Sequence, residues 1–178
     1  VDLRAALENV LGDEVPDRSW ELAQLGIIQG GLSLWDAVLH APVAYLSSAL
    51  AAKRLCTSIN AGFDENDALG GLAVTRAVEK LQGKVLEAAE VNLHRQRFQK
   101  HFSNLVDALA KQTLLQSQVG DTSFQAHVAF SALPTAGVRL TAPPTADGKE
   151  IDAPLCQIAL KRRIRISVSN QTFAHVVE

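Results

Sequence analysis

Apolar residues recur at steps of three and four positions along most of this chain of 178 residues, which is the spacing of amphipathic helices. Gly12 follows the first such run and is suited to end a helix, and Pro16 is suited to begin the next. We therefore predict a mainly α protein, a bundle of about five to seven helices with an extended, proline-containing C-terminal segment. The expected helices cover residues 2–11, 16–25, 33–55, 67–94, 98–109, 123–133 and 152–166.

The longest of the early helices is expected to follow a pair of glycines. Gly30 and Gly31 allow a turn with positive φ or a close approach of two backbone segments. Ser33 followed by Asp36 resembles a capping box, which predicts a helix start. Pro42 predicts a kink in the preceding turn, or two helices that meet there. The face expected to be buried contains Trp35, Val38, Leu39, Tyr45, Leu46 and Ala49.

Two later runs each present a seam of apolar residues to a neighbour. The first seam contains Val74, Val78, Leu81, Val85 and Ala88, and the second contains Phe98, Phe102, Leu105 and Leu109. No Pro or Gly lies between Gly83 and Gly120, so the two runs can form one long helix. Four seam steps in the first run and three in the second fall short of a sustained coiled coil, so we expect packing within the chain, with pairing between chains as the alternative.

The character of the chain changes after residue 133. Pro143 and Pro144, followed by Asp147 and Gly148, indicate an extended piece and a turn on the surface. We therefore predict a helical core over residues 1–133, an extended connection over 134–150, and a C-terminal helix and tail over 151–178. The alternating end of the tail suits a short strand, or an arm that lies on another subunit.

Composition narrows the class of protein. Apolar residues make up 47 % of the chain with few aromatics, so the core is expected to consist of Leu, Val and Ala. The formal net charge of −2 argues against nucleic acid as the main partner, because phosphate binding usually needs a basic excess. Cys56 and Cys156 have no Cys or His at ligand spacing, so we expect two buried thiols rather than a disulfide framework or a zinc site.

Two basic clusters are the candidate partner-binding residues. They consist of Arg95, Arg97 and Lys100 around Phe98, and of Lys161, Arg162, Arg163 and Arg165 near the end of the last helix. For the first cluster a solvated helix face is favoured over a phosphate track. For the second, solvated cations that interact with the helix C-terminus are favoured over an acidic protein partner, and nucleic acid comes third.

Four segments carry a resemblance to a known family. They are GGLSLWDAVLHAPVAYLSS from Gly30, LQSQVG from Leu115, VRLTAPPTADG from Val138 and IALKRRIRI from Ile158. The first is similar to the segment that follows the polymerase core in non-LTR retrotransposon reverse transcriptases, and the others resemble, in the same order, the tail of those polyproteins. The resemblance implies a helical thumb and connection, which helps such polymerases to hold the template duplex. The zinc-knuckle-like segment of that family is absent here, which weighs against capture of nucleic acid by the tail.

A search for catalytic groups is negative. The resembled polymerases need paired aspartates for two metal ions, and no YxDD-like sequence occurs here. Asp64, Glu65 and Asp67 are better explained by helix capping than by a metal site. The five histidines show no ligand motif, and neither phosphate-loop nor dinucleotide-binding spacing surrounds any glycine. We expect no enzyme activity, cofactor or metal.

Other protein subunits are therefore the expected partners, with nucleic acid as the alternative. The segment 32–52 is the one long enough to be considered for a membrane, but Asp36 inside it would cost about 2.5 to 3.5 kcal/mol, so we expect a soluble, intracellular chain with no membrane span. The absence of Met suggests a processed product or a fragment. The favoured hypothesis is a non-catalytic helical scaffold or accessory subunit, with a repurposed retroelement fragment as one origin; the alternative is a nucleic-acid-binding thumb or connection segment.

Overall fold

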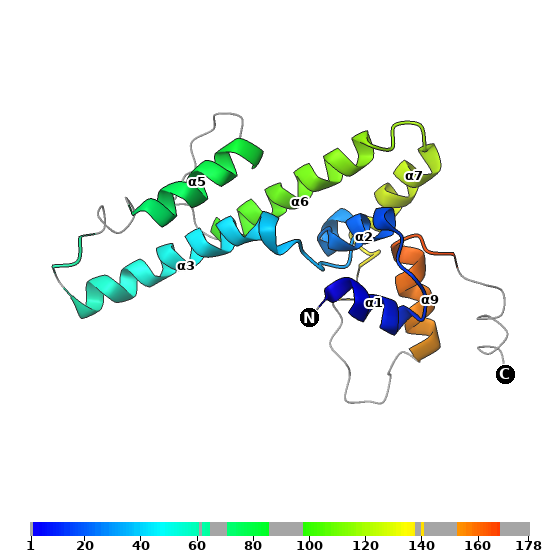
Figure 1. Cartoon of the computed structure of the whole chain (residues 1–178), viewed down its shortest axis with the longest axis horizontal. Helices are drawn as coiled ribbons and strands as arrows, with labels where there is room; N and C mark the ends of the chain where they lie inside the picture. Colours follow the sequence, from blue (N-terminus) through cyan, green and yellow to red (C-terminus); the bar gives the residue numbers. More distant parts are fainter. Residues whose placement is uncertain are drawn as a thin grey trace. The chain divides into compact units, whose positions relative to one another are not determined.

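The computed structural model of the chain is mainly α-helical (Figure 1). It describes residues 2–60, 62–64, 71–85, 98–137, 140 and 153–167, and no strand lies in this part of the chain. Within these residues there are seven α-helices and one short 3-10 helix, which confirms the predicted fold class. The elements are α1 (Leu3–Leu11), α2 (Asp17–Gln24), the 3-10 helix η1 (Ile27–Gln29), α3 (Ala37–Ile59), α5 (Leu72–Val85), α6 (Phe98–Gln116), α7 (Thr122–Ser131) and α9 (Ala153–Arg163).

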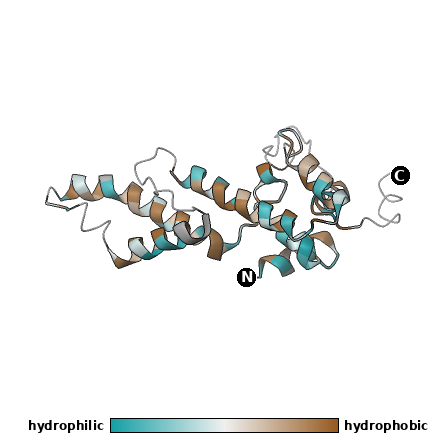
Figure 2. Ribbon diagram, turned by 90° about the horizontal axis from the view of Figure 1, so that it is seen from above, coloured by the Kyte–Doolittle hydropathy of each residue, from teal (hydrophilic) through white to brown (hydrophobic). Residues whose placement is uncertain are grey.

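The chain divides into two compact units. Unit 1 consists of Val1–Trp35 and Ala110–Glu178, and unit 2 is the continuous stretch Asp36–Leu109. Apolar and polar residues alternate along the helical ribbons (Figure 2), as expected for helices that each bury one side. The predicted division into residues 1–133, 134–150 and 151–178 stays a prediction, since much of the last two segments lies outside the described residues.

Unit 2 is organised around α3. Its inward seam, which we define as Leu39, Val43, Leu46 and Leu50, packs on apolar residues of α5 and α6. The facing residues are Val74, Ala77, Val78, Leu81, Phe98, Phe102, Leu105 and Val106. The seam advances by four, three and four residues, the step that keeps one side of a helix against a neighbour. The predicted seams of α5 and α6 are confirmed at Val74, Leu81, Phe98 and Phe102, which are all buried.

Unit 1 has two apolar clusters. One joins α1, α2 and the end of α9 through the buried Leu7, Leu11, Val15, Ala23 and Ile164. The other joins α2, α6 and α7 through Leu22, Leu25, Leu114, Phe124 and Val128. A hydrogen bond of 2.7 Å from the Gln157 side-chain amide to the Val10 carbonyl adds a polar tie between α9 and α1. The structure confirms Gly12 as a left-handed helix end, with φ of 65°.

The double glycine forms the tightest part of unit 1. Gly30 has φ of 105°, which an L side chain rarely adopts. A Cβ atom added at Gly31 would lie 2.1 Å from the Leu25 carbonyl oxygen, so only glycine fits there. The prediction of a positive φ or a close backbone approach is confirmed by both residues.

The predicted start of α3 at Ser33 is wrong. The helix begins at Ala37, where the Asp36 carboxylate caps it by accepting a hydrogen bond of 2.7 Å from the Val38 backbone amide. The Ser33 hydroxyl instead accepts a hydrogen bond of 3.1 Å from the Ile27 amide. The alternative of two helices meeting near Pro42 is also wrong, because α3 is a single helix that contains Pro42.

The predicted buried face of α3 is wrong by part of a turn. Leu39 and Leu46 belong to the inward seam, but Val38 is 73 % exposed and Tyr45 is 45 % exposed. Trp35 lies before the helix and is also exposed. Apolar residues recur at steps of three and four on two sides of α3. The face predicted from the sequence combines residues from both sides.

Smaller differences concern α7 and α9. Phe124 and Val128 are buried as predicted, whereas Phe130 is exposed. On α9, Leu155 is exposed and Ile158 is buried. The cysteines are intermediate in exposure rather than buried. The predicted continuity of residues 85–98, the extended segment 141–150 and the tail 168–178 lie outside the described residues.

We predict that Leu46→Ala lowers the free energy of unfolding by about 2–5 kcal/mol, because it leaves a cavity in the inward seam. Leu72→Ala is the matched control, since Leu72 is 65 % exposed and its truncation should change stability by less than about 0.5 kcal/mol. Urea denaturation followed by circular dichroism measures both. Amide hydrogen exchange should assign the loss to α3 and α5, and equal effects of the two substitutions would contradict the packing described.

Candidate functional site

The dense cations at the end of α9 are largely internal to unit 1. Lys161 is buried, and its ammonium group donates a hydrogen bond to the Asp13 carboxylate in the loop between α1 and α2. This pair ties α9 to the loop beside the cluster that contains Ile164. The predicted solvation of the cations is therefore wrong for Lys161.

Arg163 is buried, and each of its three guanidinium nitrogens donates a hydrogen bond to a backbone carbonyl. Nε donates to the Gly31 oxygen at 2.8 Å, Nη1 to Ala136 at 2.9 Å, and Nη2 to Ile27 at 2.7 Å. Burial lowers the pKa of this guanidinium from its ordinary value. The side chain thus holds the glycine turn and the segment after α7 in place.

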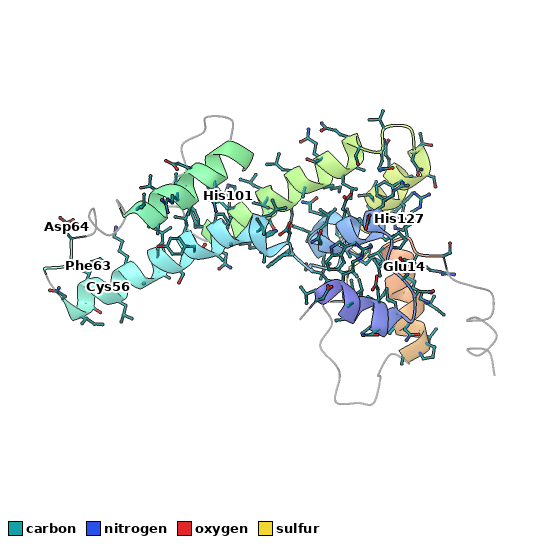
Figure 3. All side chains as sticks on the ribbon, viewed as in Figure 1. Glu14, Cys56, Phe63, Asp64, His101 and His127 are labelled. Carbon is teal, nitrogen blue, oxygen red and sulfur yellow. The ribbon has the colours of Figure 1, made fainter. Side chains whose placement is uncertain are left out.

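The backbone of Arg163 is held as well. Its carbonyl oxygen accepts a hydrogen bond of 2.9 Å from Nε2 of His127 on α7, the residue labelled in Figure 3. Gly137 lies beside the same guanidinium, and a Cβ there would meet the Ile27 side chain at 2.3 Å. Arg163 is therefore a structural centre of unit 1, and each of its three guanidinium nitrogens already donates a hydrogen bond within the chain.

Arg165 ends α9 in a strained conformation. Its φ is 63°, a region that costs a non-glycine residue about 1–2 kcal/mol. The amides of Arg165 and Ile166 donate to the carbonyls of Arg162 and Lys161, which is the pattern of a Schellman helix end. The Arg165 side chain donates to the Ser123 hydroxyl at 3.0 Å and lies 3.3 Å from the Asp121 carboxylate, contacts that help to offset the strain.

The Asp121 carboxylate, just before α7, forms salt bridges with two arginines, Arg18 and Arg165. Arg18 lies 2.6 Å from the same carboxylate, and its guanidinium stacks 3.8 Å above the centre of the Phe124 ring. The carboxylate also accepts a hydrogen bond of 2.8 Å from the Phe124 amide and so caps α7. The hydrogen bond from Arg18 is the largest cause that lowers the pKa of Asp121, from 3.8 to about 2.

The remaining predicted partner-binding residues divide into exposed and undescribed ones. Lys100 is exposed on α6, and Arg162 is exposed on α9. Arg95 and Arg97 lie outside the described residues. The partner-binding role of the seven residues therefore stays a prediction.

A buried pair that the sequence search did not single out lies in unit 2. His40 Nε2 on α3 is 3.3 Å from Asp107 Oδ1 on α6, and the two side chains are only 11 % and 4 % exposed. The sequence feature that could have indicated this pair is the position of Asp107, which follows Val106 on a helix whose neighbouring turns are apolar. An acidic residue there needs a partner, because an unpaired buried charge is strongly unfavourable.

The exposed side of α3 is the most unusual surface among the described residues. We define its exposed seam as Val38, Ala41, Tyr45, Ser48, Ala52, Leu55 and Ile59, all of which are exposed. They follow one another by alternating steps of three and four and include no charged residue. Leu55 is 62 % exposed and Ile59 is 77 % exposed. A helix that is apolar on two opposite sides normally has both sides covered.

Two kinds of site are not found in the described part of the chain. No group of three or more His, Cys, Asp and Glu residues there is placed to hold a metal ion. None of the described helices is long and apolar enough to cross a membrane. Comparison of the chain with protein-family models, with curated proteins and with solved structures finds no match. The candidate site is therefore defined by geometry alone.

We predict that Arg163→Lys lowers the free energy of unfolding of unit 1 by about 2–4 kcal/mol. A lysine ammonium keeps the charge but cannot reach all three carbonyls that the planar guanidinium bridges. Arg162→Lys, on the exposed side of the same helix, is the matched control and should have little effect. Equal stability of the two variants in urea denaturation would show that the carbonyl contacts are not structural.

Asp121→Asn should remove a pH-dependent part of the stability of unit 1. Because the pKa is about 2 in the folded chain and 3.8 otherwise, the carboxylate stabilises the fold above about pH 4 and loses this contribution as the pH falls through about 2. Asparagine still caps a helix, so the substitution isolates the charge. The difference in unfolding midpoint between wild type and variant should shrink from pH 5 towards about pH 2, and also in 1 M salt. A difference that is constant with pH would refute the role of the charge.

Proposed function

We propose that this chain is a non-catalytic helical scaffold or accessory subunit that binds protein partners through the exposed seam of α3. The single observation that carries the proposal is that α3 is apolar on both sides, while α5 and α6 cover only its inward seam. An exposed apolar row along a whole helix is a feature of protein interaction sites. A groove-binding or helix-binding partner recognises such a row through residues spaced by three and four.

The chemistry of the row supports a protein partner. Burying a Val, Leu or Ile side chain from water contributes about 1.5–3 kcal/mol, and Val38, Leu55 and Ile59 are each more than half exposed. Tyr45 adds an aromatic ring of the kind that is enriched at protein interfaces. The small residues between them allow another helix to approach closely.

The alternative of a nucleic-acid-binding thumb or connection segment has weaker support. It would use the cations around Phe98 and those near the end of α9, and of the latter Lys161 and Arg163 are buried and donate to groups of the same chain. Arg165 is already engaged with Asp121 and Ser123. The retroelement resemblance concerns the origin of the chain, and a repurposed fragment is compatible with the scaffold role.

Leu55→Lys tests the proposal, because it places a charge in the C-terminal half of the exposed seam. Thr57→Lys is the control, since Thr57 is exposed on the same turn and lies off the seam. Lysine near the C-terminus of α3 is compatible with the helix in both variants. Native mass spectrometry of the natively isolated chain should show a defined protein complex for wild type and Thr57→Lys, and loss of that complex for Leu55→Lys.

Two outcomes would contradict the scaffold role. The first is a wild-type chain that is isolated as a monomer with no other protein bound, which would show that the exposed seam binds no protein. A complex that survives Leu55→Lys and dissociates steeply between about 50 and 200 mM salt, with nucleic acid bound, would favour the alternative function.

A further inference from the structure

The exposed seam of α3 has a symmetry of its own. Its residues lie at nearly equal distances along the chain before and after Ser48. The resulting pairs are Val38 with Ile59, Ala41 with Leu55, and Tyr45 with Ala52. When a helix packs antiparallel on a copy of itself, residues related in this way face one another. The large Leu55 would therefore face the small Ala41, and the large Tyr45 would face the small Ala52.

This size pattern is what self-pairing requires. Facing positions in a well-packed seam alternate large and small side chains so that the two surfaces interdigitate without voids. At the centre, Ser48 would face the Ser48 of the second copy, where two small hydroxyl-bearing residues can hydrogen-bond to each other. The ends of the seam, Val38 and Ile59, are both branched apolar residues.

The electrostatics favour the antiparallel orientation. The seam contains no charged residue, and the positions directly beside it, Ala44, Ala51 and Ser58, are also uncharged and exposed. No like charges therefore oppose the approach of a second copy. Antiparallel helices also place the positive N-terminal end of each dipole beside the negative C-terminal end of the other.

The area is sufficient for a specific but weak pair. The 23 residues of α3 extend over about 34 Å, and two-fifths of the circumference of a helix of this length is on the order of 500 Å² per copy. A contact of about 1,000 Å² in total is at the threshold of a specific protein interface. The pair is expected to dissociate on dilution.

We propose that the exposed seam of α3 binds the same seam of a second copy of this chain, antiparallel and centred on Ser48. This inference rests on the proposed function, since it names the occupant of the same surface. The chain then forms a two-fold symmetric dimer in which residues 41 and 55 of opposite copies face each other.

A charge-pair experiment tests the register. Ala41→Glu alone and Leu55→Lys alone should each lower the dimer association constant of the full chain about tenfold or more, measured by sedimentation equilibrium. The double variant should associate about tenfold more tightly than Leu55→Lys, because two Glu–Lys pairs form across the antiparallel interface. The two positions are fourteen residues apart, about 21 Å along one helix, so they cannot pair within a chain. In a parallel dimer like charges would meet, and the double variant would bind more weakly still.

A cross-linking measurement covers the case in which the charged variants perturb the fold. In a Cys56→Ser, Cys156→Ser background, Ser48→Cys should form a disulfide-linked dimer on mild oxidation, because two cysteines on the two-fold axis can meet the required separation. Thr57→Cys, off the seam, should form none.

The outcomes separate this inference from the proposed function. The proposed pairing would be overturned if the double variant dimerised no more tightly than Leu55→Lys. It would also be overturned if Thr57→Cys formed as much disulfide-linked dimer as Ser48→Cys. A wild-type chain that is monomeric at all concentrations, but loses a different co-purifying protein on Leu55→Lys, would overturn the second copy as occupant and leave the scaffold function standing. A monomer with no protein partner would overturn both.

Discussion

Helix α3 carries apolar residues around more of its circumference than α5 and α6 cover. The inward seam accounts for the core of unit 2, where Val43 and Leu46 are almost completely buried. The exposed seam repeats the same three-and-four step on another side and leaves Val38, Leu55 and Ile59 in water. Exposed apolar area of this extent is unfavourable unless something covers it, and this is the physical basis of the proposed binding function.

Unit 1 uses its cations for a different purpose. Arg163 connects three backbone carbonyls of two loops, and Lys161 holds the loop that contains Asp13. Each of these buried donors is engaged with a carbonyl or carboxylate of the same chain, and each is therefore unavailable to a partner. The basic cluster near the end of α9 therefore serves mainly to hold α9 against the loops of unit 1.

The helices and some of their ends could be predicted because they depend on local chemistry, although the predicted start of α3 at Ser33 differs from the observed start at Ala37. Gly12, Pro16 and Gly31 occupy the roles that their backbone properties favour. The buried side of α3 could not be predicted, because both sides show a helical apolar step and only tertiary packing distinguishes Val43 from Val38. The burial of Arg163 was equally hidden, since its carbonyl partners are 27 to 136 residues away in the sequence.

The pair of His40 and Asp107 is a second reason why one apolar side of α3 is inward and the other is not. Hydrophobic burial alone already favours the inward seam, whose members are all Leu or Val, whereas the exposed seam includes Ala41, Ser48 and Ala52. His40 lies one turn before Val43, beside the inward seam, and reaches Asp107 only when that seam faces α6. Turning α3 to bury Val38 and Leu55 instead would separate the pair and leave the Asp107 carboxylate buried without its histidine, which adds to the cost of losing the inward apolar contacts. The polar contact thereby reinforces the packing of unit 2 that leaves the exposed seam outward.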